Sequence, residues 1–299
     1  MKEKIFLSGV AGMLGEAFYN VFSKNYLLKC TDIDLNETWL HYLDFRNANK
    51  YQLAVKEFKP DYLFHIGAYT DLEFCEKNPI DAHLTNTDSV KTAVSISNQL
   101  CIPLLYISTA GIFDGLKVSY DENDIPKPMG IYAKTKYEAE KFVQSNCNKF
   151  LICRAGWMMG GGPKKDKKFI NKIIKQIKDG KKELFIVDDK FGTPTYTNDF
   201  AKNTELLIKK KCYGLYNMAC EGNTSRLEVA REILKILNME KSIKITKVDS
   251  SYFAKTFFAE RPNSENLVNR KLNEKNLNLM RPWKVTLEEY LKNSYKDYF

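Results

Sequence analysis

Tyr132 and Lys136 form a Tyr-x-x-x-Lys pattern just after a turn-rich stretch that contains Pro126 and Pro128. On a helix, residues four apart share one face, with Cβ atoms about 6 Å apart. A lysine ammonium beside a phenol favours the phenolate and lowers the pKa of the tyrosine from its usual value of about 10. Such a tyrosine could donate a proton to a ketone oxygen while a hydride reaches the carbonyl carbon. The pattern therefore predicts acid–base chemistry on a carbonyl group.

A second copy of the pattern, Tyr137 with Lys141, competes with the first. A step of five residues turns a helix by about 140°, so the two tyrosines cannot share one face. Ser108 and Thr109 separate the alternatives, because they end the preceding predicted strand at the carboxyl edge of the sheet. Ligands of open parallel sheets bind at that edge, where a hydroxyl can hydrogen-bond the substrate oxygen. Tyr132 begins the next helix and lies near this edge, so we expect Tyr132 to be the acid and Tyr137 to contribute to packing.

A glycine pattern, Gly9-x-x-Gly12-x-x-Gly15, follows the apolar residues 5–7 and opens the first amphipathic stretch. The first glycine permits a tight turn, the second lets the backbone approach a pyrophosphate, and the third lets the helix pack on the strand. The helix N-terminus also offers free N–H groups and the positive end of the helix dipole. This strand–turn–helix position predicts a dinucleotide site with contacts from Gly9, Gly12, Met13, Leu14 and Gly15.

Acidic residues after the second predicted strand indicate how the cofactor is selected. Asp32 ends that strand and can accept hydrogen bonds from an adenosine ribose diol, while Asp34 is a nearby alternative. A carboxylate here repels a 2′-phosphate, and no Arg or Lys follows Asp32 before Asn36. We therefore expect NAD(H) or NADP(H) to bind, with NADH favoured. Asp44 could accept a hydrogen bond from the adenine amino group, or it could be a helix cap or a solvated loop acid.

The elements that must position these groups alternate along the first half of the chain. Short apolar runs predict strands, and amphipathic stretches predict helices. Strands are expected at residues 4–7, 26–31, 61–66, 103–108 and 150–154. Helices are expected at residues 13–23, 51–58, 79–99 and 131–146. This order predicts an α/β fold, in which a doubly wound, Rossmann-type parallel sheet carries helices on both faces.

The pattern of elements changes after about residue 156. Residues 160–163, Gly-Gly-Gly-Pro, and the lysines after them indicate a mobile loop. Further strands are expected at residues 184–187, 215–218 and 243–248, with helices near residues 197–209 and 225–237. We therefore expect residues 1–156 to form a dinucleotide-binding domain. Residues 157–299 would form a smaller C-terminal substrate-binding region, which can interleave with the first.

Composition excludes several classes of protein. Of the 299 residues, 44% are hydrophobic, which is enough for a substantial core. The net charge of +9 fits a lysine-rich solvated surface, or a field that attracts an anionic ligand such as a nucleotide. The basic runs at residues 164–168 and 209–211 lack interleaved aromatic residues. We therefore expect no nucleic-acid partner.

The cysteines, the histidines and the hydropathy of the chain indicate whether it binds a metal and in which cellular compartment it works. Seven cysteines show no Cys-x-x-Cys pair, and three histidines are scattered, so we expect no metal site. Reduced thiols suit a reducing cytoplasm. No apolar run approaches the roughly 20 residues that span a bilayer. A cytoplasmic protein without membrane contact is the expectation.

Several motifs together resemble the dTDP-4-dehydrorhamnose reductases, which are extended short-chain dehydrogenases/reductases that act on nucleotide sugars. The glycine pattern, Ser108-Thr109 and the first Tyr-x-x-x-Lys pattern carry the general resemblance. More specific stretches are Ala68-Tyr69-Thr70-Asp71, Phe113-Asp114-Gly115, residues 187–195, Gly214-Leu215-Tyr216-Asn217, Arg261-Pro262 and Arg281-Pro282-Trp283. The resemblance runs from the first strand nearly to the C-terminus. It implies NAD(P)H-dependent reduction of the keto group of a nucleotide-diphosphate 4-keto-6-deoxy sugar, for surface polysaccharide biosynthesis.

The resemblance also implies roles for individual residues. The catalytic trio would be Thr109, Tyr132 and Lys136. The loop near the cofactor phosphates would be Gly67, Ala68 and Tyr69. The substrate contacts would be Ser108 and Trp157 at the sugar, Phe191, Thr193 and Pro194 at the nucleotide base, and Arg261 at the diphosphate. For Trp157, a place in the hydrophobic core is the alternative.

One stretch departs from the family. Ala110-Gly111 stands where the family usually has Asp-Tyr, which removes a carboxylate and an aromatic ring close to the sugar. The departure leaves the nucleotide and the sugar open, and it argues against a sugar 4,6-dehydratase, in which an Asp-Glu pair here supplies the acid and base. The alternatives are a nucleotide-sugar epimerase and a catalytically silent regulatory subunit on the same scaffold. A homodimer is a further expectation by analogy with these folds.

Overall fold

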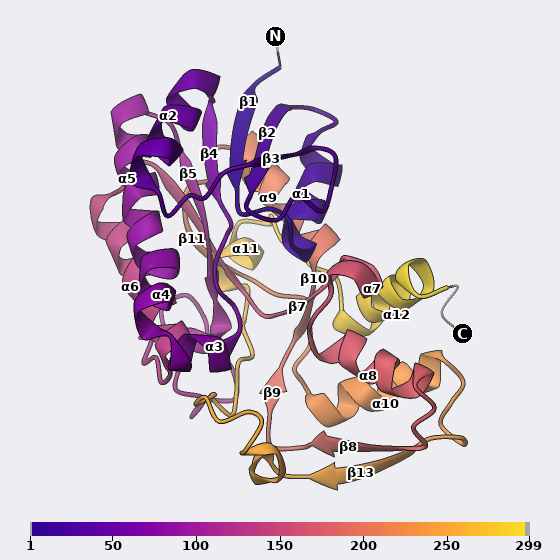
Figure 1. Cartoon of the computed structure of the whole chain (residues 1–299). Coiled ribbons are helices and arrows are strands. Elements are labelled where there is room, and N and C mark those ends of the chain that lie inside the picture. Colours follow the sequence, from indigo (N-terminus) through magenta and orange to yellow (C-terminus); the bar gives the residue numbers. More distant parts are fainter. Residues whose placement is uncertain (1, 297–299) are drawn as a thin grey trace.

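A seven-stranded parallel sheet forms the centre of the protein, whose computed structural model describes residues 2–296 (Figure 1). Its strands are β1 Lys4–Ser8, β2 Leu27–Asp32, β3 Leu40–Tyr42, β4 Tyr62–His65, β5 Leu104–Thr109, β6 Phe150–Ala155 and β11 Gly214–Met218. They are ordered β11-β6-β5-β4-β1-β2-β3. The strand order reverses between β1 and β4, which opens a crevice at their carboxyl ends. The expected Rossmann-type α/β fold is confirmed.

Helices cover both faces of the sheet (Figure 1). One face carries α2 Ala48–Phe58, α5 Ser89–Leu100 and α6 Ile131–Asn146, and the other carries α1 Met13–Phe22 and α9 Thr197–Lys209. The central strands are mostly apolar because both of their faces are buried. In β1, Phe6 packs on the α2–α5–α6 side, while Ile5 and Leu7 pack on the α1–α9 side.

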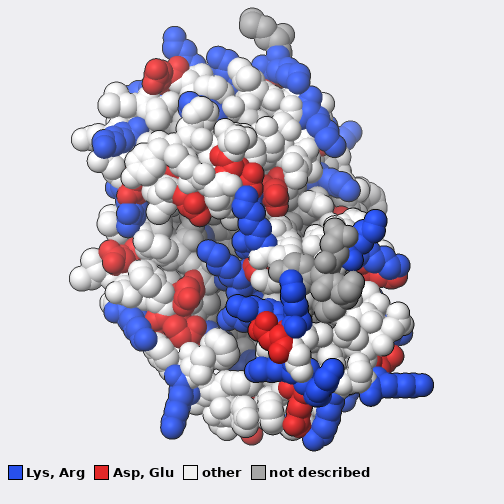
Figure 2. All heavy atoms as spheres, turned by 45° about the vertical axis from the view of Figure 1, so that its right-hand side comes forward, with Lys and Arg blue, Asp and Glu red and all other residues white. Residues whose placement is uncertain are grey.

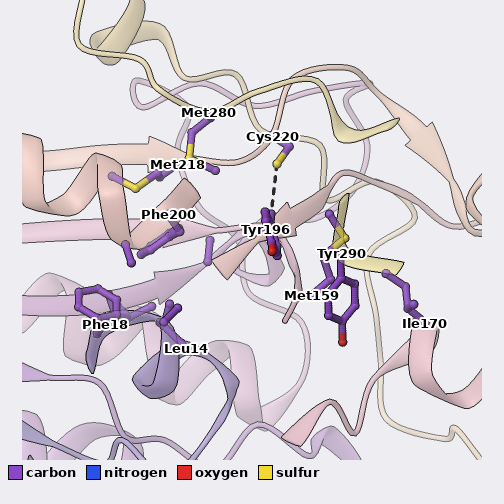
Figure 3. Packing of buried hydrophobic residues seen from close by; sticks show 14 of the residues in the cluster. Leu14, Phe18, Met159, Ile170, Tyr196, Phe200, Met218, Cys220, Met280 and Tyr290 are labelled. Carbon is purple, nitrogen blue, oxygen red and sulfur yellow. Dashed lines mark hydrogen bonds between the residues drawn. The ribbon is translucent and has the colours of Figure 1, made fainter. Parts of the chain in front are cut away.

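The hydrophobic core on the α1–α9 side of the sheet continues into the C-terminal part of the chain (Figure 3). Leu14 and Phe18 of α1 lie near Phe200 of α9, and the rings of Phe18 and Phe200 are 6.4 Å apart. Tyr196 belongs to the same cluster, and its backbone N–H donates to the Cys220 sulfur at 3.4 Å. One apolar cluster therefore joins the sheet to the smaller region.

The smaller region lies below the carboxyl edge of the sheet in Figure 1. Its strand pairs are β7 Trp157–Met159 with β10 Pro194–Tyr196, β8 Glu183–Val187 with β13 Lys244–Val248, and β9 Phe191–Gly192 with β12 Thr224–Ser225. Its helices are α7 Gly162–Lys165, α8 Phe169–Lys178, α10 Arg226–Ile236, α11 Arg270–Glu274 and α12 Trp283–Ser294. Because β11 pairs with β6 inside the central sheet, residues on either side of position 156 interleave.

Two local predictions differ from the structure. The long helix expected at residues 79–99 is divided into α4 Pro79–His83, the π-helical turn Leu84–Asp88, and α5. The mobile loop expected from residue 160 onward instead contains α7 and leads into α8, which the sequence interpretation left out. The apolar positions of α8 recur at helical spacing and are buried at Ile170, Ile173, Ile174 and Ile177.

The remaining short elements connect these parts. They are α3 Leu72–Lys77, the 3₁₀ turns Ala110–Ile112 and Ser250–Phe253, and the segment 113–130 that leads to α6. Within residues 2–296, no helix is long and apolar enough to cross a bilayer. All seven cysteines are free, and the described residues contain no cluster of His, Cys, Asp or Glu that could hold a metal ion.

Candidate active site

Tyr132 lies in the first turn of α6, where two other elements fix its position. The backbone N–H of Ile131 donates to Glu76 Oε1 at 2.7 Å, which caps the start of α6 from α3. Thr109, at the carboxyl end of β5, hydrogen-bonds the Tyr132 phenol. The structure therefore brings together the tyrosine of one predicted motif and the hydroxyl of another.

The pKa of Tyr132 differs in direction from the sequence expectation. Burial raises the pKa of the phenol well above its usual value, and the negative charge of Glu265 raises it further. The hydrogen bond from Thr109 opposes this effect. Lys136 was expected to lower the pKa, but desolvation is the larger influence, so the phenol is held in its protonated form. A protonated phenol is the state that an acid needs before it donates.

Lys136 is buried one helical turn beyond Tyr132 and is held against β5. The Tyr106 hydroxyl donates to the Lys136 carbonyl oxygen at 3.0 Å, and the Lys136 ammonium lies 4.2 Å from the centroid of the Tyr106 ring. Burial lowers the pKa of Lys136 to about 7, and the charge of Glu140 partly opposes this shift. Lys136 thus changes charge near neutral pH, unlike an exposed lysine.

The competing pair has different surroundings. Tyr137 is half-buried and packs against the small cluster that contains Phe113 and Tyr120, as expected for a packing residue. Lys141 is exposed, and its ammonium lies 5.0 Å from the centroid of the Tyr137 ring. Among the described residues we find no hydrogen bond between this pair and Thr109.

Ser108 and Thr109 end β5 with different hydrogen-bond states. The Thr109 Oγ1 accepts the N–H of Gly111 at 3.1 Å, so its own proton serves the Tyr132 oxygen or a substrate oxygen. The Ser108 Oγ is buried and has no hydrogen-bond partner among the described residues. A buried hydroxyl without a partner costs free energy. This polar atom therefore fits a position where a bound molecule completes the hydrogen bonds.

The glycine turn after β1 shows why three glycines are needed. A Cβ on Gly9 would lie 2.1 Å from the Gly67 Cα, and Gly9 has a φ of +75°. A Cβ on Gly15 would lie 2.1 Å from the Val10 carbonyl oxygen. Gly12 differs, because a Cβ there would meet no atom within 4 Å, and no side chain caps α1 at this position. Gly12 therefore opens the helix N-terminus to a ligand, which fits a pyrophosphate.

The two residues between Gly12 and Gly15 have separate roles. The Leu14 side chain is buried in the core, so only its backbone is available to a cofactor. Met13 is partly exposed, and a Cβ on Gly161 would lie 3.0 Å from the Met13 Cβ. The loop before α7 thus passes close to the start of α1.

Asp32 lies at the end of β2, beside this turn. Its Oδ2 accepts the N–H of Ala11 at 2.9 Å, and its Oδ1 accepts the N–H of Asp34 at 3.0 Å. A carboxylate held in this way keeps lone pairs for a ribose diol. Asp34 itself receives a hydrogen bond from the Asn36 amide at 3.2 Å, so it belongs to the same loop network.

Asp44 and the 67–69 loop form the other wall of the crevice. Both oxygens of Asp44 bind the Arg46 guanidinium, at 2.6 Å for the shortest contact. Arg46 also donates to the Tyr69 hydroxyl at 3.3 Å. The backbone of Tyr69 is fixed by Asn86, which accepts its N–H at 2.8 Å and donates to its carbonyl at 3.1 Å. Gly67 donates its N–H to Ser8, so Gly67 and Ala68 run beside the glycine turn.

The residues predicted around the nucleotide base divide into two groups. Phe191 is 44% exposed and presents its ring. Thr193 and Pro194 are buried, and the Thr193 hydroxyl donates to the Gly222 carbonyl at 2.9 Å. The side chains of Thr193 and Pro194 therefore pack inside the fold, because β10 pairs with β7 directly beneath them. Their contact with the nucleotide base stays a prediction.

Trp157 and Arg261 also have partners within the protein. The Trp157 Nε1–H donates to Glu265 Oε2 at 2.5 Å, and the ring is partly exposed. Arg261 donates from one nitrogen to both oxygens of Glu73, at 2.6 and 2.8 Å, and from another to the Ala259 carbonyl. The predicted diphosphate contact of Arg261 thus competes with this ion pair.

Arg226 is a site residue that the sequence interpretation missed. Its guanidinium lies 3.7 Å from the centroid of the Trp157 ring and 4.7 Å from that of Phe169. Desolvation lowers its pKa to about 10, and the negative charge of Glu265 partly opposes this shift. Among the described residues we find no hydrogen bond or ion pair to the Arg226 side chain, so the guanidinium keeps donors for an anion.

A sequence signal for Arg226 does exist. The residue stands at the first position of α10, directly after the N-cap residue Ser225, whose capping-box partner is Glu228. The positive end of the helix dipole disfavours a cation there. A basic residue at such a position indicates a function that outweighs this cost.

The open space at Gly12 gives a testable prediction. We expect Gly12→Ala to weaken NADH binding about tenfold or more, because the new methyl group would occupy the path of the pyrophosphate. Thermal stability should stay unchanged, since a Cβ there meets no atom within 4 Å. Gly15→Ala is the matched comparison, and it should lower the melting temperature by clashing with Val10. Fluorescence titration with NADH and a melting curve measure both, and a folded Gly12→Ala protein with unchanged affinity would contradict the assignment.

The chain is similar to known proteins over nearly its whole length. The family described as RmlD substrate binding domain matches residues 3–296. The dTDP-4-dehydrorhamnose reductase of Salmonella typhimurium is 29% identical over 188 residues, which are 61% of this chain and 62% of that enzyme. This alignment spans less than two thirds of the relative's length. The spore coat polysaccharide biosynthesis protein SpsK of Bacillus subtilis is 28% identical over 292 residues, covering 96% of both chains.

A solved structure extends the similarity over the whole fold. The crystal structure of dTDP-4-dehydrorhamnose reductase from Bacillus anthracis in complex with NADP superposes with a TM-score of 0.89 at 28% identity. The superposition covers 98% of this chain and 100% of that one.

Proposed function

The chain belongs to the RmlD substrate binding domain family, and we propose that it reduces the keto group of a nucleotide-diphosphate 4-keto-6-deoxy sugar with NAD(P)H. The observation that carries this proposal is the hydrogen bond between Thr109 and the protonated Tyr132 phenol at the carboxyl edge of the sheet. A neutral acid and an orienting hydroxyl at this edge suit proton transfer to a carbonyl oxygen.

The reaction needs one proton and one hydride. Bound NAD(P)H supplies the hydride to the carbonyl carbon. Thr109 donates its hydroxyl proton to orient the carbonyl oxygen, and Tyr132 transfers its own proton to that oxygen. The Lys136 ammonium, one turn away, favours the resulting phenolate, which regains a proton from solvent. The product is the corresponding sugar alcohol.

Two features support a nicotinamide dinucleotide as the cofactor: the open helix start at Gly12 and the Asp32 carboxylate. For the adenosine ribose, Asp32 favours NADH. However, Lys164 from α7 donates to the Asn36 carbonyl at 3.0 Å and to Glu37 at 2.8 Å. This cation, distant in sequence, reduces the repulsion of a 2′-phosphate, so we expect only a narrow preference for NADH over NADPH.

Cations beside the sugar site support an anionic substrate. Lys and Arg side chains gather around the middle of the face shown in Figure 2. In the site itself, the positive charge of Arg261 lowers the pKa of Arg226. The same charge also lowers the pKa of Lys190. We expect the diphosphate of the nucleotide sugar to bind at Arg226, with Lys190 nearby.

Arg226→Gln tests this placement. We expect the KM for the nucleotide sugar to rise about 10–100-fold with little change in kcat, because a charge-assisted contact made equally in the ground and transition states is lost. Arg231→Gln, an exposed position on the same helix, is the control and should change neither constant. Equal KM values for Arg226→Gln and wild type would place the diphosphate elsewhere.

The proposed function is tested by absorbance at the nicotinamide band. Purified protein is mixed with NADH or NADPH and a panel of dTDP-, UDP-, GDP- and CDP-4-keto-6-deoxy sugars. Oxidation with one sugar supports the reductase and identifies its nucleotide. Tight cofactor binding without oxidation would instead favour an epimerase, which retains its cofactor, or a silent subunit. The homodimer and the cytoplasmic location stay predictions, and seven free cysteines suit a reducing compartment.

A further inference from the structure

The place of the missing family carboxylate is taken by a residue from a distant segment. Ala110 and Gly111 stand where the resembling family has Asp-Tyr. The position that a Cβ on Gly111 would occupy lies 3.2 Å from Glu265 Oε1 and 3.5 Å from Thr109 Oγ1. The space left by the small residue is therefore bordered by a carboxylate on one side and by the catalytic threonine on the other.

Glu265 is held firmly at this point. Its N–H donates to the Phe191 carbonyl at 2.9 Å, and the neighbouring Ser264 forms a β-bridge with Phe191. On the other side, Leu267 forms a β-bridge with Tyr120. Both sides of the residue are thus fixed to other parts of the fold, which limits the conformations available to its backbone.

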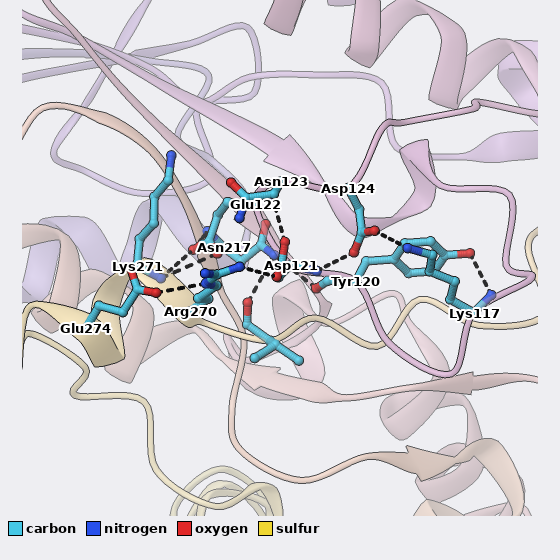
Figure 4. Close-up of polar contacts among 11 residues, drawn as sticks. Lys117, Tyr120, Asp121, Glu122, Asn123, Asp124, Asn217, Arg270, Lys271 and Glu274 are labelled. Carbon is cyan, nitrogen blue, oxygen red and sulfur yellow. Dashed lines mark hydrogen bonds and ion pairs between the residues drawn. The ribbon is translucent and has the colours of Figure 1, made fainter.

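A buried polar network anchors the second of these bridges (Figure 4). The Asn217 amide of β11 donates to the carbonyls of Tyr120 and Val268, at 3.1 Å each. Glu122 accepts the N–H of Asn217 at 3.0 Å and also the N–H of Lys271. Because the central sheet itself supplies these contacts, the segment that carries Glu265 is tied to the same frame as β5 and Thr109.

The two carboxylate oxygens of Glu265 have different roles. Oε2 accepts the Trp157 indole N–H, which fixes the orientation of the carboxylate. Among the described residues we find no donor to Oε1, which borders a pocket that is also lined by Gly111, Tyr132 and Leu72. A carboxylate oxygen with free lone pairs beside the catalytic tyrosine can accept a hydrogen bond from a substrate.

Sugar chemistry identifies the donor. The carbon atoms next to C4 of a 4-keto-6-deoxy hexose are C3, which carries a hydroxyl, and C5, which carries the methyl group and the ring oxygen. Since Tyr132 meets the C4 oxygen, a neighbouring acceptor can receive a proton only from the substituent on C3. We propose that Glu265 determines substrate specificity by binding the 3-hydroxyl of the keto sugar through Oε1. This inference rests on the proposed function and names the substrate group that it requires.

The negative charge of Glu265 also raises the pKa of Tyr132, the proposed acid. It helps to keep the Tyr132 phenol protonated, together with burial and the nearby Cys75. The other ionisable groups around this pocket are Glu76, Glu260 and, one helical turn away, Lys136. The cations that interact with the charge of Glu265 are Arg226 and Lys190. Loss of the negative charge at position 265 should therefore lower the pKa of the Tyr132 phenol, while the fall of kcat/KM above about pH 7, which follows Lys136, should remain.

Glu265→Gln is the test, because glutamine keeps the size and can still accept the Trp157 N–H. Two dTDP-4-keto-6-deoxy sugars are compared, one with the 3-hydroxyl and one 3-deoxy. We expect kcat/KM for the hydroxyl sugar to fall about 10–100-fold, and that for the 3-deoxy sugar to change little, so that the discrimination between them disappears. Glu274→Gln, an exposed position, is the control and should leave both values unchanged.

Binding is measured in parallel, by calorimetry of the cofactor-loaded protein with dTDP-hexoses that have or lack the 3-hydroxyl. Loss of discrimination in the variant supports the role of Glu265, whether or not the wild type reduces the keto sugars. If the wild type reduces neither sugar, only the proposed reduction is overturned. Equal losses for both sugars, or none, would overturn the role of Glu265 while the reductase activity stands. If Glu265→Gln does not fold, Glu265→Ser is compared in the same way.

Discussion

Tyr132→Phe should reduce turnover by about 10²–10⁴-fold, the range expected when a general acid is removed. The phenol is the group that meets the carbonyl oxygen, and Phe keeps the ring but not the proton. Affinity for NADH should be unchanged, because the glycine turn lies on the other side of the crevice. The hydrogen bond to Thr109 contributes only about 0.5–1.5 kcal/mol to stability, so the variant should fold.

The chain provides its own control for this change. Tyr137→Phe alters the same residue type on the same helix, in the second Tyr-x-x-x-Lys pattern, and should leave turnover near the wild-type value. Steady-state rates with the substrate found in the nucleotide-sugar panel measure both variants. A Tyr132→Phe protein that keeps most of its activity would show that another group donates the proton.

Lys136→Met should lower turnover by roughly 10²–10³-fold, the size typical for losing one preorganised charge at a reacting centre. In the wild type, the pKa of Lys136 is about 7, so the ammonium form is lost as the pH rises through this value. We therefore expect kcat/KM of the wild type to fall above about pH 7. The residual kcat/KM of Lys136→Met should not fall at this pH. Profiles of kcat/KM against pH for both proteins measure the difference.

Stability separates a catalytic from a structural role for Lys136. The folded protein lowers the pKa of this lysine below its unfolded value, so the unfolded state binds more protons between about pH 7 and 10.5. The cost of burying the ammonium is fully present below pH 7 and disappears as the pH rises towards 10.5. Urea unfolding at pH 6 should therefore show Lys136→Met to be at least as stable as the wild type. A large loss of stability would indicate that Lys136 serves the fold.

The sequence by itself determined the features that depend on neighbouring residues. Gly9, Gly12 and Gly15 predict the turn after β1, because backbone conformation and close approach are local requirements. The spacing of Tyr132 and Lys136 predicts a shared helix face for the same reason. Ser108 and Thr109 could be placed at the sheet edge because they end an apolar run. The order of strands and helices then limits the topology to a doubly wound sheet.

Only the tertiary structure decided which distant groups meet. Glu265 enters the space at Gly111, and Arg226 stacks on Trp157, through contacts that no periodicity along the chain encodes. Packing also set the pKa of Tyr132, where desolvation outweighs the expected effect of Lys136, and it buried Thr193 and Pro194 where β10 pairs with β7. The physical reason is common to all of these cases. Burial and charge act through space, so their effects follow from the folded packing, whereas turns and helix faces follow from residues a few positions apart.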